Sequence, residues 1–394
     1  MRVCAVRLAR AFATALGALA GVWLSLRALS FASPAAPAAD PRSWDRDWAA
    51  ALAVLDERPS RLAAAHAALV EDDWLAGELA LPVVARAHGD GLATLRAALR
   101  ARLPAARERA CIGLGLLGSE AGPAVADLLG ALRDPAAVVR ASAAWALGRT
   151  ADASEPVVAA LVERLDVDEE WVRREAVAAL ARVSPAPPPA IVRRLTGVDS
   201  ARCAWALLVV TNMGPRAAPA VPALVTLARE YRNADLFRRT TAALRAIGPA
   251  AAPAAGPLLA RLRTGDAADA GHAGAALAAI GAPSVPGLLD VAAAGDRRTT
   301  AALQVLDDMG DGATEALGVA LAEAAPPVRR LAAALLAQRA SSSAGARQAL
   351  SRARTDPDVE VAAIACRAAV ATGDRPAESC REVDAPSAPV RAAP

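Results

Sequence analysis

The chain has 394 residues and a net charge of +3, and it is 55% apolar although only 3% of its residues are aromatic. This length allows two or three compact domains or one elongated array. Alanine supplies most of the apolar content, and alanine has the highest helix propensity. Runs of β-branched and aromatic residues that suit strands are nearly absent, so the composition predicts an all-helical protein and argues against a sheet-based one.

All 44 basic residues are arginine. Arginine suits the recognition of nucleic acids and phosphates, but a GC-rich coding sequence produces the same bias. The position of the charges decides between these explanations. The first 32 residues contain four arginines and no acid, so their removal takes the net charge from +3 to −1. A body this close to neutrality lacks the positive field of a DNA-binding protein, and no nucleic-acid partner is expected.

The amino terminus has the features of a secretory signal peptide. Three arginines precede an apolar run over residues 11–26, and Ser30-Phe31-Ala32 offers small residues at a cleavage site. The run is shorter than the ~20 residues that usually span a bilayer. We predict a signal peptide over 1–32, with an uncleaved anchor to the inner membrane as the alternative. In both cases the positive-inside rule places the body outside the cytoplasm, as a periplasmic or secreted protein.

The segments that flank the main body differ from it in composition. Residues 33–43 are rich in Pro and Ala and are predicted to be a linker. Trp44 and Trp48 lie four residues apart on one face of a predicted helix, in a segment where the repeat pattern is faint. End units of a repeat array are usually atypical, so 44–103 is predicted to be an N-terminal helical cap. Residues 377–394 are predicted to form a flexible tail.

The repeated pattern is clearest in residues 134–148. Val139, Ala143 and Leu147 lie four residues apart and form one apolar helical stripe, and near copies begin at Val172 and Val328. Glycines end this helix in most units at a mean spacing of about 32 residues, within the range of helical repeats. These glycines are Gly118, Gly148, Gly214, Gly248, Gly281, Gly310 and Gly373.

Each unit contains two predicted helices. A glycine is followed by a short loop, often with a proline, and by an apolar helix; an acidic turn such as Asp134-Pro135 then precedes the second helix. One such pair cannot bury its own apolar face, so neighbouring pairs have to stack. We predict an α-solenoid of stacked helix pairs over residues 104–376, with about eight to nine repeats.

The second helix carries a recognisable pattern: Asp134, Val139-Arg140, Ala143-Ala144 and Ala146-Leu147-Gly148. On these residues the chain resembles the HEAT-repeat superfamily, and its short units are similar to the phycobilisome-lyase-type HEAT-like repeats. The resemblance covers about residues 104–376. It implies a ladder between units, in which turn aspartates pair with helix arginines. Asp134 with Arg140, and Asp166 or Asp168 with Arg173, fit these roles, whereas the copies at 199–214, 266–281 and 296–310 depart from the pattern.

Residue types for catalysis are scarce. A nucleophile and its base require His or Lys near Ser or Cys, but the sequence has no lysine and three isolated histidines, His66, His88 and His272. Motifs for metal ligation and phosphate binding are absent. We therefore predict a protein that is not an enzyme and holds neither a metal nor a cofactor.

The concave face is the predicted site of function, because second helices line that face in HEAT-like stacks. Ala141, Ser142 and Trp145 lie off the apolar stripe and are expected to face outward. Aligning the units predicts an inner column that docks a protein, a peptide or an acidic ligand: Trp145, Arg174, Arg202, Trp205, Arg239, His272, Arg298 and Arg330. Trp and Arg dominate binding energies at interfaces. In the alternative, the tryptophans fill gaps between alanine-rich helices and the arginines form salt bridges between repeats.

The positions of the cysteines suggest one disulfide bond. Cys111 and Cys203 lie among alanines and are expected to be buried. Cys366 falls in the last helix and Cys380 in the segment after it, so the two are candidates for a disulfide in an oxidising compartment.

Together these features predict a non-catalytic binding scaffold, exported or anchored in the membrane. Two alternatives remain: a chromophore (bilin) lyase or isomerase, which only the repeat subfamily suggests, and a HEAT-like nucleic-acid binder, which the near-neutral charge disfavours.

Overall fold

The computed structural model describes residues 61–70, 77, 80–81, 84, 88–295 and 298–374, where all regular secondary structure is helical. After α3 (Arg61–Val70), the chain forms nine helix pairs in these ranges. The first helices of the pairs are α5 (His88–Ala98), α7 (Val125–Ala131), α9 (Glu155–Val167), α11 (Pro189–Thr196), α13 (Val221–Glu230), α15 (Ala255–Thr264), α17 (Val285–Ala293), α19 (Thr314–Glu323) and α21 (Ala344–Ala353). The second helices are α6 (Pro104–Leu117), α8 (Ala137–Leu147), α10 (Glu170–Val183), α12 (Ser200–Met213), α14 (Ala234–Ile247), α16 (Ala267–Ile280), α18 (Thr299–Asp308), α20 (Pro326–Arg339) and α22 (Val359–Ala371).

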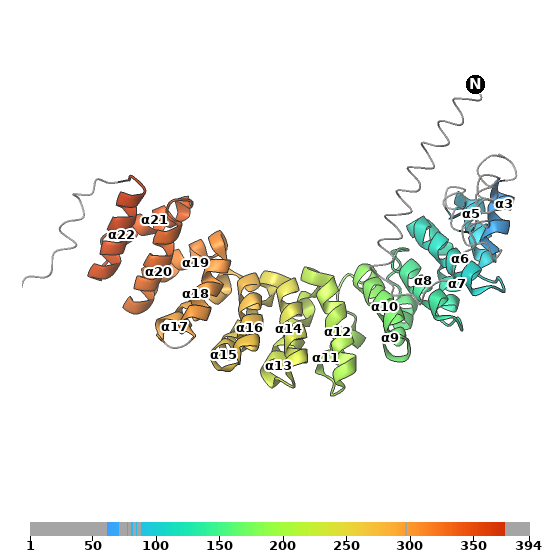
Figure 1. Cartoon of the computed structure of the whole chain (residues 1–394), viewed down its shortest axis with the longest axis horizontal. Helices are drawn as coiled ribbons and strands as arrows, with labels where there is room; N and C mark the ends of the chain where they lie inside the picture. The colour runs from blue at the N-terminus through green and yellow to red at the C-terminus, as the bar shows by residue number, and fades with distance from the viewer. Residues whose placement is uncertain are drawn as a thin grey trace, which may run out of the picture.

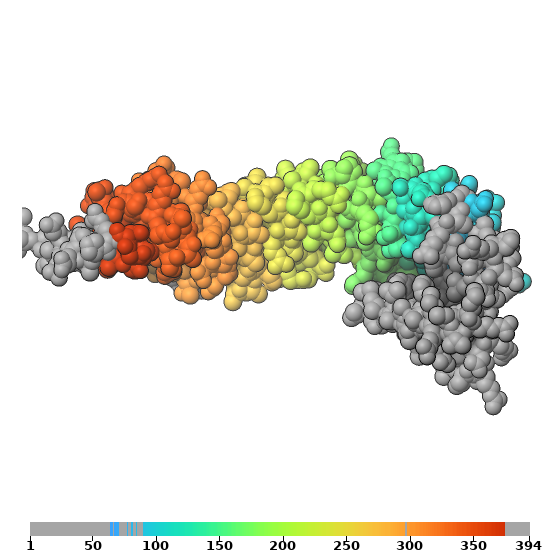
Figure 2. All heavy atoms as spheres, turned by 90° about the horizontal axis from the view of Figure 1, so that it is seen from above, coloured from blue at the N-terminus to red at the C-terminus, as the bar shows by residue number. Residues whose placement is uncertain are grey.

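The pairs stack side by side into an arc, with the helices lying across its long axis (Figure 1). From α6 to α18 each second helix packs against the next second helix, and from α11 to α21 each first helix packs against the next first helix. Seen from above, the colours follow one another in sequence order along an elongated body (Figure 2). The predicted all-α solenoid is confirmed. α5, which falls within the predicted cap, packs against α6 as the first helix of a pair.

The apolar stripe is buried as predicted. Val139, Ala143 and Leu147 are each 0% exposed, and the core of the described residues continues from unit to unit as mostly Ala, Leu and Val. Gly148 is part of this packing: its φ is −59°, and a Cβ there would come within 2.9 Å of the Cα of Ala179 on α10. This glycine is therefore needed for the close approach of two helices, and not for the flexible helix end that the sequence suggested.

Other marker glycines are needed for their backbone conformation. Gly118, Gly214 and Gly248 have φ values of 60°, 59° and 74°, a region that favours glycine. Each begins a 3₁₀ segment that leads into the following first helix: η1 (Gly118–Ala124), η2 (Gly214–Ala220) and η3 (Gly248–Ala254). Two shorter 3₁₀ segments, η4 (Ala282–Ser284) and η5 (Gly310–Ala313), serve the later units.

Several predicted segments lie outside the described residues: the leader, the linker, Trp44 and Trp48 of the cap, and the tail at 377–394. Within the described part, the run Pro104–Ala131 is long and apolar enough to cross a membrane by length and composition alone. This run comprises α6, η1 and α7, and both α6 and α7 pack against α8 in the stack.

Cys111 and Cys203 are free and buried, as predicted. Burial is the main reason why the pKa of each thiol is raised. Because the thiolate is the reactive form, both should resist alkylation in the folded chain and react only after unfolding. Iodoacetamide labelling followed by mass spectrometry, with and without urea, checks this. Labelling of either cysteine in the native chain at the rate of a free thiol would contradict it.

Candidate functional site

Trp145 packs against the preceding unit. Its ring is half-buried and lies on Gly115 of α6, where a Cβ would overlap the ring. The guanidinium carbon of Arg149 lies 5.0 Å from the ring centroid, and Arg149 Nε donates a 2.8 Å hydrogen bond to the Gly115 carbonyl. Trp145 therefore fills the space between α6 and α8 while part of its ring stays at the surface.

Trp205 also lies near the second helix before it, but at the N-terminal end of that helix. The ring is half-buried on α12, and the guanidinium carbon of Arg173 on α10 lies 5.7 Å from its centroid. Ala141, which was expected to face outward, is only 3% exposed, so that expectation is wrong. These contacts favour the alternative in which the tryptophans fill gaps between helices, although both rings also reach solvent.

The arginines of the predicted column already have partners within the chain. Arg174 pairs with Glu170 at 2.6 Å, and Arg239 pairs with Asp235 at 2.7 Å, each along its own helix. Two others reach beyond their own helix. Arg202 lies 3.4 Å from Asp166 and 3.5 Å from Asp199, and Arg330 contacts Asp358 and Glu360 at 3.0 and 2.9 Å. The column is thus close to electrically neutral.

His272 lies half-buried on α16, and no ion pair or hydrogen bond of its side chain is found in the described part of the chain. The side chains of the other two histidines, His66 and His88, lie outside the described residues. The structure therefore does not join His272 to a nucleophile or to a metal-ligand set. Among the described residues, no group of three His, Cys, Asp or Glu side chains could hold a metal ion.

A ladder of ion pairs links adjacent units, but its pairing differs from the expected one. Asp134 accepts hydrogen bonds from Arg107, and Arg140 reaches forward to Asp168, with shortest distances of 2.6 Å in both pairs. Arg140 Nη1 instead meets the backbone carbonyl of Asp134 at 2.9 Å. Each arginine thus binds the aspartate of the next unit. The prediction that the side chains of Asp134 and Arg140 pair with each other is therefore wrong.

The ladder recurs near the carboxyl end, where Arg329 binds Asp356 at 2.9 Å. In all these pairs the arginine and aspartate are 27 or 28 residues apart, and this constant offset is the sequence signal that could have identified Arg107 and Arg329. Arg173 departs from the ladder: within the described residues it forms no ion pair with Asp166 or Asp168 and lies over Trp205 instead. Asp166 binds Arg194 at 2.8 Å.

Asp168 is the most buried acid of the ladder, with its side chain 1% exposed. Burial alone would raise the pKa of this carboxyl. Hydrogen bonds from Arg140 and from the backbone N–H of Glu169, together with the charges of Arg140 and Arg164, outweigh burial and lower the pKa below its usual value. The pKa of Asp134 is also lowered, and Arg107 is the main hydrogen-bond donor to this carboxylate. Both aspartates are therefore held as carboxylates at neutral pH.

A second set of arginines binds backbone carbonyls near the ends of helices in the preceding unit. Arg149 reaches Gly115, Arg216 reaches Ser184 at 2.9 Å, and Arg298 reaches Gly265. Arg232 and Arg339 act in the same way on Gly197 and Leu306. Carbonyls at a helix C-terminus lack helical partners and attract cations. Arg298, predicted to bind a partner protein, therefore has a structural role in joining units.

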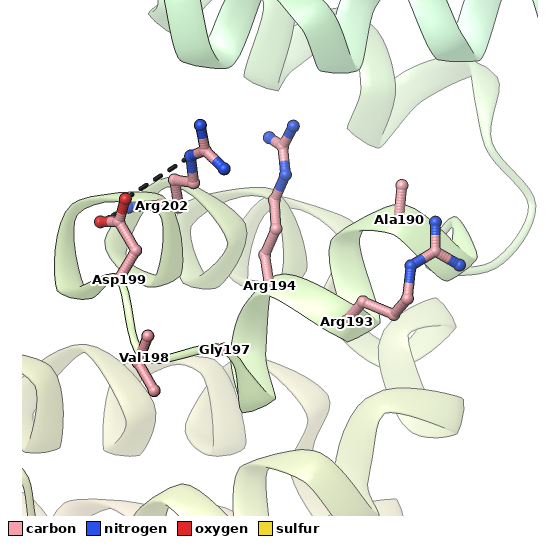
Figure 3. Close-up of a pocket in the computed structure, with 7 residues that line it drawn as sticks. All are labelled: Ala190, Arg193, Arg194, Gly197, Val198, Asp199 and Arg202. Atoms are coloured by element: carbon pink, nitrogen blue, oxygen red, sulfur yellow. Dashed lines mark hydrogen bonds and ion pairs between the residues drawn. The ribbon is translucent and has the colours of Figure 1, made fainter.

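The ends of α11 and α12 border an open hollow of about 380 Å³. We call it the arginine hollow; its polar lining is Arg193, Arg194, Asp199 and Arg202 (Figure 3). All of its lining residues come from α11, α12 and the turn between them. Arg202 was predicted from the sequence, whereas Arg193 and Arg194 were not, because only the packing of α11 against α12 places them beside it.

Cys366 is disulfide-bonded. Cys380, its predicted partner, lies outside the described residues, and the pairing of these two cysteines stays a prediction.

We expect Trp145→Ala to lower the free energy of unfolding by about 1.5 kcal/mol, because the ring loses its packing on Gly115 and its contact with Arg149. Urea denaturation followed by circular dichroism measures the loss. Val138→Ala, which truncates a 39% exposed side chain of the same helix, is the control and should change the value by no more than ~0.5 kcal/mol. Equal effects of the two substitutions would contradict a packing role for Trp145.

Part of the chain matches a known protein family, and several solved structures are similar to most of it. Residues 92–181 match the family described as HEAT repeats. An engineered protein of known structure is 22% identical over 84% of this chain and 99% of its own, with a TM-score of 0.36. Importin beta is 16% identical over 85% of this chain and 53% of its own, with a TM-score of 0.45. Yeast importin-beta (Kap95p) is 15% identical over 82% of this chain and 51% of its own, with a TM-score of 0.45.

The chain thus spans about half the length of each importin. A search of curated proteins finds no match. The matched residues run from α5 to α10, and the same kind of helix pair continues to α22. Residues 92–181 therefore match HEAT repeats, and the described chain as a whole is a stack of helix pairs.

Proposed function

We propose that the chain is a non-catalytic scaffold that docks a partner protein or peptide on its concave face. The observation that carries this proposal is a set of half-buried tryptophans on three successive second helices: Trp145 on α8, Trp171 on α10 and Trp205 on α12. Tryptophan side chains that remain partly open to solvent offer large contact areas at little entropic cost, and they are enriched among the residues that dominate binding.

The charge balance supports a partner held mainly by apolar contacts. Four arginines of the predicted column, Arg174, Arg202, Arg239 and Arg330, lie beside acids of the same chain. The solenoid also offers a long surface without requiring a deep cavity, as is usual for proteins built from stacked repeats. The scarcity of groups for nucleophilic or metal chemistry supports a role without catalysis.

Site-specific photo-crosslinking tests the docking face. A benzophenone amino acid placed at Ser142, a half-buried residue one turn from Trp145, should crosslink to a partner in the cells that produce the chain. The same group at Ala159, an exposed residue of the first helix α9, is the control and should give no adduct. Equal adducts at both positions, or none at Ser142, would count against docking on this face.

We further propose that the chain is exported, or anchored in the membrane by residues 11–26. The basic start and the 16-residue apolar run support this proposal. Alkaline phosphatase fused to the carboxyl terminus is active only outside the cytoplasm, so an active fusion is expected. An inactive fusion that is stably produced would contradict export.

A further inference from the structure

The arginine hollow is positively charged and open. Figure 3 shows the guanidinium groups of Arg193, Arg194 and Arg202 extending to the same side of the turn that joins α11 to α12. Arg193 is exposed, and no ion pair or side-chain hydrogen bond of its guanidinium group is found among the described residues. Arg202 has an exposed side chain, at 58%, and lies 3.4 and 3.5 Å from its two aspartates. These separations are long for hydrogen bonds, so Arg202 can turn toward a new partner at little cost.

Arg194 occupies the inner part of the hollow. Its Nη2 donates to the Val162 carbonyl at 3.2 Å and to Asp166 at 2.8 Å, while Nη1 is shielded from solvent and has no hydrogen-bond acceptor. Burial lowers the pKa of Arg194; Asp166 opposes this effect and the positive charge of Arg202 adds to it. The inner arginine therefore lies in a region that is short of negative charge.

The charge balance of the hollow indicates how much negative charge a bound anion should carry. Three guanidinium groups face two carboxylates, Asp166 and Asp199, so one positive charge is uncompensated. A single carboxylate balances this charge, whereas a dianionic phosphate exceeds it and would be repelled by both aspartates. The planar fork of an arginine matches a carboxylate with two parallel hydrogen bonds.

The hollow also adjoins an aromatic surface. Arg202 and Trp205 lie three residues apart on α12, on the same side of the helix, and Trp205 is half-buried. A chain segment that places a carboxylate between Arg193 and Arg202 can therefore set an apolar side chain against Trp205. A small free carboxylate molecule cannot contact the arginines and Trp205 at the same time.

We propose that the arginine hollow binds an acidic side chain, Asp or Glu, of a partner peptide whose neighbouring apolar residue packs on Trp205. This assignment rests on the proposed protein-binding function and gives that function its charged anchor. Arg193 and Arg202, which lie on either side of Arg194 in Figure 3, make the contacts with the carboxylate, and Arg194 holds Asp166 in place.

Selection from a random peptide library displayed on phage, against the immobilised full chain, tests the assignment. Peptides with an acidic residue beside an apolar one should be enriched. For a selected peptide made synthetically with a fluorescent label, Arg193→Ala and Arg202→Ala should each weaken binding about tenfold, the usual value of one charge-assisted hydrogen bond. Replacing its acid by the matching amide should have an equal effect.

Arg229→Ala is the matched control. Arg229 is an exposed arginine in the last turn of another first helix, α13, and it should leave binding unchanged. Enrichment of peptides without acids, or of peptides that tolerate Arg193→Ala, overturns the assignment and leaves the scaffold function standing. No enrichment of any peptide counts against the scaffold function itself. Arg193-dependent binding of inorganic phosphate without peptide binding also overturns the assignment, in favour of a simple anion site.

Discussion

Arg140→Ala is expected to lower the free energy of unfolding by about 3 kcal/mol, the cost of leaving a buried carboxylate without its main partner. Arg140 meets Asp168 at 2.6 Å, and the two side chains are 16% and 1% exposed. The substitution leaves the Asp168 carboxylate with Arg164 at 3.5 Å and the backbone N–H of Glu169. Because the pair joins α8 to the turn before α10, its loss also weakens the contact between two units. Urea denaturation at neutral pH measures the effect.

Arg174→Ala is the control for that result. Arg174 pairs with Glu170 along one helix, both side chains are more than 60% exposed, and such a pair contributes at most ~0.5 kcal/mol. The pH dependence gives a second check. The pKa of Asp168 is lowered in the folded chain, so its stabilisation is complete above the ordinary aspartate value of 3.8 and is lost as pH falls through the folded value. The deficit of Arg140→Ala should therefore shrink below pH 3.8; a deficit that stays constant into strong acid would contradict the ion-pair explanation.

Gly148→Ala is expected to destabilise the chain by about 2 kcal/mol, the typical cost of overpacking a helix contact. In most helices the same substitution is favourable by ~1 kcal/mol, because alanine restricts the unfolded chain and favours helix. At Gly148 the new Cβ would come within 2.9 Å of the Cα of Ala179, so α8 and α10 must move apart. The clash should therefore reverse the sign of the effect.

Gly271→Ala is the matched substitution. Gly271 is an exposed residue inside α16, and a Cβ there meets nothing within 4 Å. This change should raise the free energy of unfolding by ~0.5–1 kcal/mol. Thermal denaturation of both variants beside the parent chain makes the comparison. If Gly148→Ala were as stable as Gly271→Ala, the close approach of α8 and α10 would be disproved.

The pairing of helices was predictable because it depends on local periodicity. The stripe of Val139, Ala143 and Leu147 predicts which side of α8 is buried, and the structure confirms it. The pairing of charges was not predictable from one unit. Asp134 and Arg140 are close in sequence, but Arg140 reaches the next unit because stacking places Asp168 nearer to its side chain than the Asp134 carboxylate. Such a contact depends on how units stack, which a single repeat does not contain.

The candidate site shows the same limit. The alignment of units predicts that Trp145 and Trp205 are equivalent, but the structure places them at different levels of the stack. Trp145 lies near the end of α8, against Gly115 near the end of α6, whereas Trp205 lies in the first half of α12, near Arg173 in the first turn of α10. The alignment of units contains neither the contact with Gly115 nor that with Arg173. The arginine hollow was missed because Arg193 and Arg194 lie on α11, and only the packing of α11 against α12 brings them beside Asp199 and Arg202.

Small-angle X-ray scattering of the full chain tests most directly whether adjacent units alone build the molecule. A compact globule of 394 residues would have a radius of gyration of about 21 Å. The curved stack predicts a markedly larger radius, a scattering range typical of a rod, and a distance distribution with a long tail beyond the thickness of one helix pair. A radius near the compact value, with a symmetric distance distribution, would contradict the stack and the docking surface that depends on it.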